Sequence, residues 1–303
     1  MTGPTGQVGY ELLSRLPGFG EVVALNHSQL DLASEDSIRS AVRSVQPKII
    51  VNAAAYTAVD RAESESELAL QVNGIAPGIL AEEANRCRAL LVHYSTDYVF
   101  DGKKRTPYVE EDETAPLNCY GRTKLTGEQS IARIGGAYVI LRTSWVYASR
   151  GSNFFLTMLR LGVERETLRI VDDQIGSPTP AATVADAALA IIQRCCPDAS
   201  DTYESALSVS GIYHATCAGQ TSWFQFAGAI FDEARKSALG AKLKVNEVTP
   251  IPTAEYPTPA RRPQYSVLSN DKMIRTFAFQ PPAWQEGLTT VMPQLAQQKS
   301  LNI

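Results

Sequence analysis

The chain has 303 residues, of which 44% are hydrophobic and 20% charged, and its formal net charge is −4 at pH 7. This balance is typical of a globular protein with a sizeable core, divided into one large domain or two. The mild negative charge argues against binding to a nucleic-acid backbone. No apolar run approaches the ~20 residues that a membrane span needs, and the N-terminus does not look like a secretory signal.

The five cysteines are odd in number and show no CxxC spacing. They are Cys87, Cys119, Cys195, Cys196 and Cys217. Such a set favours reduced thiols over a disulfide framework, and the three histidines lack the spacing of zinc ligands. We therefore expect a cytoplasmic protein.

The first half of the chain alternates short apolar runs with amphipathic segments. Strands are predicted at 21–25, 48–55, 90–95 and 138–143, and helices at 34–45, 66–86 and 120–133. Ser34 is a suitable N-cap for the first of these helices, and Pro47 follows its end. Apolar strands that alternate with helices predict an α/β protein with a parallel sheet covered on both faces.

The second half is less regular. Helices are predicted at 153–161, 182–194 and 223–236, short extended pieces at 168–171 and 211–216, and a polar surface loop at 198–207. Prolines cluster between Thr249 and Pro263. We place the boundary near Tyr147, which divides the chain into a dinucleotide-binding domain (1–147) and a mainly substrate-binding domain (148–303), parts of which return to the first.

A glycine-rich run, Gly3, Gly6 and Gly9, opens into a predicted helix. Glycines let the backbone approach a pyrophosphate closely, and the N-terminus of the helix offers free N–H groups. The alternative is a plain glycine-rich turn. Only Met1 and Thr2 precede the run, so the innermost strand of the expected sheet is missing. We favour a truncated start, because losing a central strand would expose two strand edges.

Asn26 stands at the end of the second expected strand, where an acidic residue would bind the ribose 2′-hydroxyl of NAD. An uncharged side chain does not repel a 2′-phosphate, so this position allows NADP. The alternative is that Asn26 only begins a turn.

Tyr120 and Lys124 are spaced i and i+4, which places a phenol and an ammonium on one face of a helix. An ammonium near a phenol lowers its pKa and makes it a better acid at neutral pH. Thr96 follows an apolar strand, at the carboxyl edge where open α/β sheets place their sites. Its hydroxyl predicts a Thr/Tyr/Lys cluster, while the neighbouring Asp97 could serve the site or cap a turn.

These motifs resemble the extended short-chain dehydrogenases, and among them the dTDP-4-dehydrorhamnose reductase family. The likeness is spread over nearly the whole chain in the segments GPTGQVG, NAAAYTAVDRAE, HYSTDYVFDG, APLNCYGRTKLTGE, LRTSWVYA, NFFLTMLRL, DDQIGSPT and TPARRPQYSVL. Together they are more specific than a glycine run and a YxxxK motif alone.

The resemblance implies a Rossmann-like, doubly wound sheet with a smaller C-terminal substrate domain. It implies reduction of the 4-keto group of dTDP-4-dehydro-6-deoxy-L-mannose to dTDP-L-rhamnose by NADPH or NADH, with NADPH favoured. Tyr120 would donate the proton, Lys124 would hold the nicotinamide ribose, and Thr96 would bond the same oxygen as Tyr120. The cofactor supplies the hydride.

The resemblance also assigns a set of residues that would line the cofactor site. These are Gly6, Gln7 and Val8 at the pyrophosphate, Asp31 and Leu32 at the adenosine end, and Ala53, Ala54 and Ala55 beneath the cofactor. The alternative for the alanines is close packing of the strand against a helix. Gly3, Gly9 and Asn26 from the motifs above, with Tyr120 and Lys124, complete the predicted cofactor site.

Four further residues, together with Thr96 and Asp97, are candidates for the sugar nucleotide. Trp145 would form a wall of the sugar pocket or belong to the core. Asn153 would bind a diphosphate oxygen or cap a helix. Arg261 and Arg262 would meet the diphosphate or form ion pairs with acidic side chains.

Some members of the family hold magnesium with acidic side chains at a dimer interface. Only Glu11 matches that pattern, because Ala182 and Gln294 stand where acids are expected, so we predict no metal. The resemblance allows a homodimer. Two alternatives for function remain: a catalytically idle, NADP-binding regulatory subunit of the same family, or another sugar-nucleotide reductase or epimerase.

Overall fold

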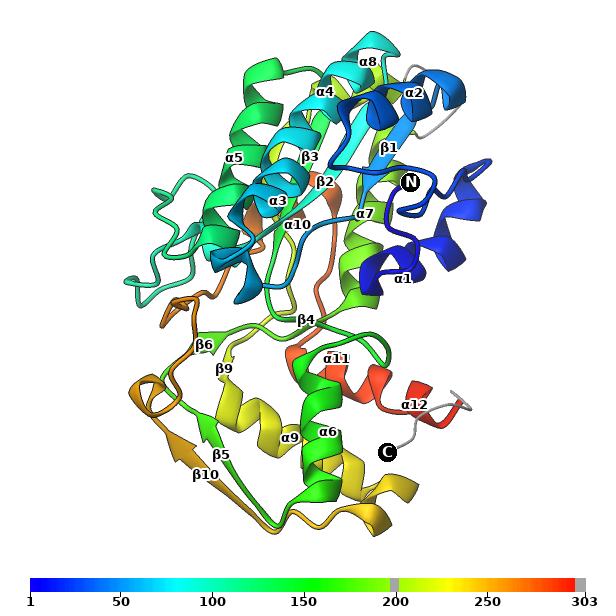
Figure 1. Cartoon of the computed structure of the whole chain (residues 1–303). Helices are drawn as coiled ribbons and strands as arrows, with labels where there is room; N and C mark the ends of the chain where they lie inside the picture. Colours follow the sequence, from blue (N-terminus) through cyan, green and yellow to red (C-terminus); the bar gives the residue numbers. More distant parts are fainter. Residues whose placement is uncertain (197–201, 298–303) are drawn as a thin grey trace.

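The structure is a computed structural model that describes residues 1–196 and 202–297 (Figure 1). Within these residues, a parallel sheet with the strand order β1-β2-β3-β8 forms the centre of the larger part. The strands are β1 (Ile49–Asn52), β2 (Leu90–Thr96), β3 (Tyr138–Thr143) and β8 (Gly211–His214). The predicted α/β fold with a parallel sheet is confirmed.

Helices cover both faces of this sheet (Figure 1). One face carries α2 (Glu35–Val45), α4 (Ala76–Arg86) and α5 (Cys119–Ile134), and the other carries α1 (Gln7–Arg15), α7 (Ala181–Cys195) and α10 (Asp271–Phe277). Successive side chains of a strand point to opposite faces, so Leu90 and Val92 pack on the α7 side while Leu91 packs on the α4 side.

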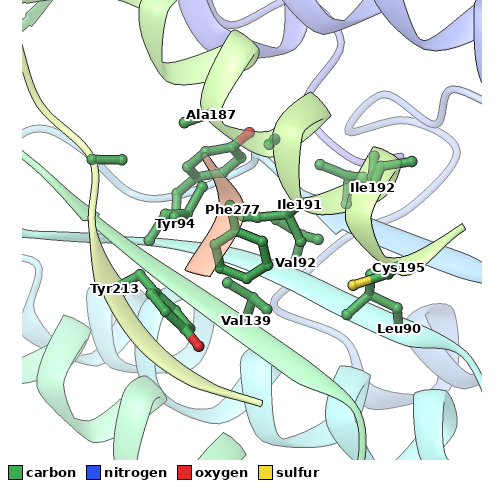
Figure 2. Close-up of a cluster of buried hydrophobic side chains, with 14 of the residues drawn as sticks. Leu90, Val92, Tyr94, Val139, Ala187, Ile191, Ile192, Cys195, Tyr213 and Phe277 are labelled. Carbon is green, nitrogen blue, oxygen red and sulfur yellow. The ribbon is translucent and has the colours of Figure 1, made fainter. Parts of the chain in front are cut away.

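The core on the α7 side joins segments from most of the chain. Figure 2 shows Val92 and Val139 from neighbouring strands against Ile191 of α7 and Phe277 of α10. Tyr213 of β8 packs edge-on against Phe277, with 4.9 Å between the ring centroids. Residues beyond 180 therefore complete the core of a sheet whose first strands lie before residue 100.

A smaller region packs around a second core (Figure 1). It contains β5 (Thr167–Val171) paired in parallel with β10 (Glu247–Ile251), and the helices α6 (Phe154–Glu164), α9 (Trp223–Arg235), α11 (Trp284–Val291) and α12 (Gln294–Gln297). Phe155, Phe226 and Phe231 are buried at its centre. The lining of the cleft described below includes residues of this region.

Shorter elements connect these parts. They are the strand pairs β4 (Val146–Tyr147) with β7 (Thr179–Pro180) and β6 (Ile175–Gly176) with β9 (Thr221–Ser222), and the helices α3 (Ser66–Leu70) and α8 (Thr202–Leu207). Single turns of tighter or wider helix are η1 (Leu16–Phe19), η2 (Arg61–Glu63), η3 (Gln71–Ile75), η4 (Asp97–Val99), η5 (Ala238–Lys242) and η6 (Thr253–Glu255).

The segment predicted as a strand at 21–25 is not a strand, and this prediction was wrong. In this segment only Leu25 forms a bridge, to Thr2. Thr2 bridges in parallel to Leu25 on one side and to Asn52 on the other. The first two residues thus occupy the place between these segments and hold the glycine run at the edge of β1.

Two other predictions differ from the structure. The polar segment 198–207 was expected to be a loop, but Thr202–Leu207 forms α8, in which Ala206 is buried against the core; residues 198–201 lie outside the described residues. The sequence also gave no signal for β10, which contains Pro250. A proline is tolerated there because β10 lies at the edge of a two-stranded pair.

Helix starts follow the expected capping chemistry. The Ser34 hydroxyl accepts the N–H of Ser37, and the Asn153 side chain accepts the N–H of Leu156. Asn118 caps α5 by accepting the N–H of Gly121 at 2.8 Å. These caps set where α2, α6 and α5 begin, and α5 carries two of the predicted catalytic residues.

A buried carboxylate ties α2 to α4. Glu83 is 1% exposed and pairs with Arg39, Arg43 and Arg86 at N–O distances of 3.0, 2.7 and 2.7 Å. Hydrogen bonds from these arginines, that of Arg43 first, lower the pKa of Glu83 from 4.5 to about 2.

We expect Glu83→Gln to reduce the free energy of unfolding at pH 7 by about 3 kcal/mol, because it removes the buried charge that Arg39, Arg43 and Arg86 share, although Arg39 keeps Glu35 and Glu82. The carboxylate stabilises the fold above pH 4.5, and this contribution is lost as the pH falls from 4.5 towards 2. Urea denaturation at several pH values should show a weaker acid dependence in the variant. An equal dependence in both proteins would contradict this account.

Candidate functional site

A cleft of about 690 Å³ lies at the carboxyl ends of the sheet strands. Its walls come from the glycine run before α1, the segments after β1, β2 and β3, one face of α5, and Trp223 at the start of α9. Open α/β sheets bind ligands at this edge. Sixteen of the predicted site residues line it: Gly3, Gly6, Gln7, Val8, Asn26, Asp31, Leu32, Ala53, Ala54, Ala55, Thr96, Asp97, Tyr120, Lys124, Trp145 and Asn153.

The glycine run has steric reasons for its composition. Gly3 has φ +64°, and a Cβ there would come within 2.9 Å of the backbone of Ala53 and Ala54. A Cβ on Gly9 would lie 1.9 Å from the Gly3 carbonyl oxygen. Gly9 is not among the cleft-lining residues, so its visible role is close packing of α1 on the run. Gly6 is the N-cap of α1 and offers no capping side chain.

The shape and chemistry of this end of the cleft fit a dinucleotide. The N–H groups of the first turn of α1 face no capping side chain, which leaves donors for a phosphate. The alanines after β1 leave a low floor for a flat ring. Asn26 accepts hydrogen bonds from the N–H and the hydroxyl of Ser28, so it forms the turn that the sequence allowed as an alternative.

Tyr120, Lys124 and Thr96 line the same cleft. The Thr96 hydroxyl lies close enough to that of Tyr120 to influence its pKa. Lys124 is 1% exposed, and its Nζ donates to the carbonyl of Tyr94 at 2.5 Å and lies 3.4 Å from Nε2 of His93.

The pKa values differ from the expectation for this cluster. Burial raises the pKa of Tyr120 to about 12, and the neighbouring Thr96 hydroxyl opposes that rise. The expected lowering by Lys124 is not found, because the Lys124 ammonium is directed at Tyr94 and His93. Burial also lowers the pKa of Lys124 from 10.5 to about 8.

Asp97 is a buried carboxylate at the edge of the cluster. It is 2% exposed and accepts hydrogen bonds from the hydroxyls of Thr96 at 3.0 Å and Ser144 at 2.9 Å. Burial raises its pKa from 3.8 to about 6, although these hydroxyls and that of Ser266 favour the charged form. Asp97 therefore holds Thr96 in place from behind.

Trp145 lines the cleft beside Trp223 and is held there by close packing. Its ring stacks on Trp223 with 3.4 Å between centroids and 6° between planes. A Cβ on Gly176 would lie 2.4 Å from the Trp145 ring, and Trp145 itself has φ +48°. The sequence did not single out Trp223. Its only signal was an aromatic residue at the start of the predicted helix 223–236.

Asn153 and the arginine pair are placed differently. Asn153 caps α6 and donates from Nδ2 to the side chain of Gln7 at 2.8 Å, so it joins the smaller region to the phosphate end of the cleft. Arg261 and Arg262 do not line the cleft. Arg262 forms an ion pair with Asp60 at 2.8 Å, and Arg261 is exposed. Of the two roles predicted for Arg262, diphosphate binding and an ion pair with an acidic side chain, the structure contains the ion pair.

The described residues contain no group of three or more His, Cys, Asp or Glu side chains that could hold a metal ion. The Glu11 carboxylate pairs with Arg15 at 2.6 Å, and Gln294 accepts a hydrogen bond from Ser149. No helix of the part that the structure describes has the length and hydropathy to cross a membrane.

A doubly covered parallel sheet, a glycine run under the cleft and a Thr/Tyr/Lys cluster at its edge define the class of protein as a dinucleotide-binding α/β enzyme of the short-chain dehydrogenase type. Solved structures share this fold. A solved UDP-glucose 4-epimerase from Thermus thermophilus matches the fold with a TM-score of 0.78 over 99% of this chain and 98% of its own, at 20% identity.

The chain belongs to the dTDP-4-dehydrorhamnose reductase family. The profile of the RmlD substrate binding domain matches residues 1–297. The dTDP-4-dehydrorhamnose reductase of Burkholderia thailandensis is 45% identical over 98% of this chain and 99% of its own length. A crystal structure of the dTDP-4-dehydrorhamnose reductase of Bacillus anthracis in complex with NADP has a TM-score of 0.84 and 37% identity, covering 97% of each chain.

We expect Asp97→Asn to change how stability depends on pH. Because the folded pKa of Asp97 lies above its unfolded value, its stabilising contribution is present below pH 3.8 and is lost as the pH rises towards 6. The difference in unfolding free energy between variant and wild type should therefore shift by about 2 kcal/mol in favour of the variant over this range. Chemical denaturation from pH 4 to 7 measures it, and a constant difference would refute the assignment.

Proposed function

We propose that this chain reduces the 4-keto group of dTDP-4-dehydro-6-deoxy-L-mannose and so forms dTDP-L-rhamnose. The observation that carries the proposal is the joint placement of Thr96, Tyr120 and Lys124 in one cleft with the glycine run. Family membership supports the same reaction, because relatives named dTDP-4-dehydrorhamnose reductase match nearly the whole chain.

The chain's own residues have distinct parts in this reaction. NAD(P)H, when bound, supplies the hydride. Tyr120 donates its hydroxyl proton to the oxygen of the former ketone, and the neighbouring Thr96, which Asp97 holds through a hydrogen bond, helps to place the same oxygen. Lys124 lines the cleft beside them and would hold a ribose hydroxyl of the cofactor.

NADPH is our choice of cofactor over NADH. Asn26 carries no charge that would repel a 2′-phosphate, and the Bacillus anthracis relative was solved with NADP. Gln7 and Val8 in the first turn of α1 would bind the pyrophosphate, while Asp31 and Leu32 would flank the adenosine end. The proposal also includes a homodimer, which family membership supports. It places the protein in the cytoplasm, which the free thiols at all five cysteines support.

The test is to incubate purified protein with NADPH and the 4-keto-6-deoxy sugar nucleotide, follow the loss of absorbance at the reduced-nicotinamide band, and identify the product. Formation of dTDP-L-rhamnose supports the proposal. An epimerised ketone without NADPH consumption would instead support an epimerase, and cofactor binding without any turnover would support an idle regulatory subunit.

In the same assay, Tyr120→Phe should lower kcat by about 10²–10⁴-fold, because it removes the proton donor and leaves the ring in place. NADPH affinity, measured by fluorescence titration, should stay close to that of wild type. Tyr256→Phe is the matched control, since this tyrosine is 59% exposed and lies outside the cleft lining. Full turnover by Tyr120→Phe would remove Tyr120 as the acid.

Trp145→Ala should raise the KM for the sugar nucleotide roughly tenfold and change the KM for NADPH less, because it removes one wall of the sugar end. Trp145→Phe keeps a flat ring against Gly176 and should recover most of the affinity. Steady-state kinetics with each substrate varied in turn will show the order of the two effects. A larger effect on NADPH would place Trp145 away from the sugar.

A further inference from the structure

A chain of buried polar groups runs beneath the floor of the cleft to Lys124. Nε2 of His93 lies 3.4 Å from Nζ of Lys124, and Nδ1 of the same ring lies 3.0 Å from Nδ2 of Asn52. The Thr2 hydroxyl lies 2.7 Å from Oδ1 of Asn52. Each of the four side chains belongs to a residue at most 4% exposed.

The far end of this chain is fixed by the backbone. The N–H of Ala54 donates to the Thr2 hydroxyl oxygen at 3.1 Å. A backbone N–H is only a donor, so it sets the direction of the hydrogen bonds that follow. Thr2 then donates its own proton to Oδ1 of Asn52, and Asn52 presents its NH₂ group to His93.

This direction selects one form of the His93 ring. Since Nδ1 accepts from Asn52, the ring proton of neutral His93 is on Nε2, the nitrogen that faces Lys124. The reverse orientation of Asn52 would leave the buried Thr2 hydroxyl proton without an acceptor among its described contacts. Burial and the nearby Lys124 lower the pKa of His93 well below 6.5, so the ring is neutral.

The Nε2–H form of His93 affects whether Lys124 is protonated. A neutral amine can donate one N–H to the Tyr94 carbonyl and accept the Nε2–H of His93 with its lone pair. An ammonium has no lone pair, so it would set an N–H against the N–H of His93. The ring of His93 thus favours the amine over the ammonium.

We propose that the hydrogen bonds from the Ala54 N–H through Thr2 and Asn52 fix His93 in the Nε2–H form. His93 is then a positioning residue that makes the charged form of Lys124 less stable relative to the neutral amine. We call this hydrogen-bond chain the relay. The hydrogen-bond chain does not depend on which reaction the protein catalyses. Its effect on the kinetics rests on the proposed function.

Other titratable groups also act on Lys124 or its neighbours. They are Tyr94 on β2, Tyr120 and Glu128 on α5, Asp97 after β2, Arg142 on β3 and Glu63 on η2. Of these, Glu128 raises the pKa of Lys124, but its carboxylate is shared with Arg142 at 2.7 Å and with the Ser95 hydroxyl. None of these contacts involves Thr2 or Asn52, so substitutions at the far end of the chain test the relay separately.

The first test is nuclear magnetic resonance of the ligand-free protein labelled with ¹⁵N histidine. His93→Gln assigns the His93 signals, and the exposed His27 provides an internal reference. We expect His93 to be in the neutral Nε2–H form from pH 8 down to pH 5. A neutral Nδ1–H form, or a ring that takes up a proton in this range, would overturn the proposal.

The second test removes the relay at its distant end. Thr2→Val deletes the donor to Asn52, so His93 is no longer held in one form, and the pKa of Lys124, followed through its ¹³Cε signal, should rise by about one unit, a tenfold change in the amine-to-ammonium ratio. Thr2→Ser should restore the wild-type value. Thr126→Val, a matched change on α5 with its hydroxyl bonded only to the helix carbonyl of Arg122, should leave it unchanged. An unmoved Lys124 in folded Thr2→Val refutes the relay.

Asn52→Asp gives an independent reading, because a carboxylate can only accept and should reverse His93 to the Nδ1–H form. In the reductase assay, the limb of the kcat–pH profile that follows Lys124 should move upward in Thr2→Val and return in Thr2→Ser. A relay seen by resonance without any reductase activity would refute only the proposed function. An active enzyme with an unmoved His93 and Lys124 would refute only the relay.

Discussion

A lysine side chain buried under the edge of a sheet is the constraint from which the site is built. Lys124 is 1% exposed, and an ammonium removed from water needs hydrogen-bond acceptors or loses its proton more easily. The carbonyl of Tyr94 on β2 accepts a hydrogen bond from Nζ, the ring of His93 favours the neutral amine, and the register of β1 against β2 sets Asn52 beside His93. The pairing of the strands therefore brings together the side chains that act on Lys124.

Many of the strands, helices and helix caps could be predicted from the sequence because they depend on residues that are close together in the chain. The apolar runs that became β1, β2 and β3 had to be buried on both faces, and Ser34 and Asn153 are side chains that cap helices. Tyr120 and Lys124 shared a helix face by spacing alone. Their grouping with Thr96 followed from the rule that sites lie at the carboxyl ends of parallel strands.

The features that the sequence could not predict depend on contacts between residues that are far apart in the chain. The segment 21–25 has strand composition, but it forms a single bridge, between Leu25 and Thr2, which lie 23 positions apart. The stack of Trp223 on Trp145 joins residues 78 positions apart, and the ion pair of Arg262 with Asp60 joins residues 202 positions apart. The pKa of Tyr120 depends on burial and on the direction of the Lys124 amine, and neither is a property of the YxxxK spacing.

The place of β8 in the sheet has a consequence for synthesis of the protein. β8 (Gly211–His214) closes the sheet beside β3, and α7 and α10 cover the face that it shares with the earlier strands. A nascent chain that has left the ribosome only as far as residue 180 would present β3 with an open edge and one bare apolar face. Such an intermediate has the features that chaperones bind, so slow translation before β8 would lengthen its exposure to aggregation.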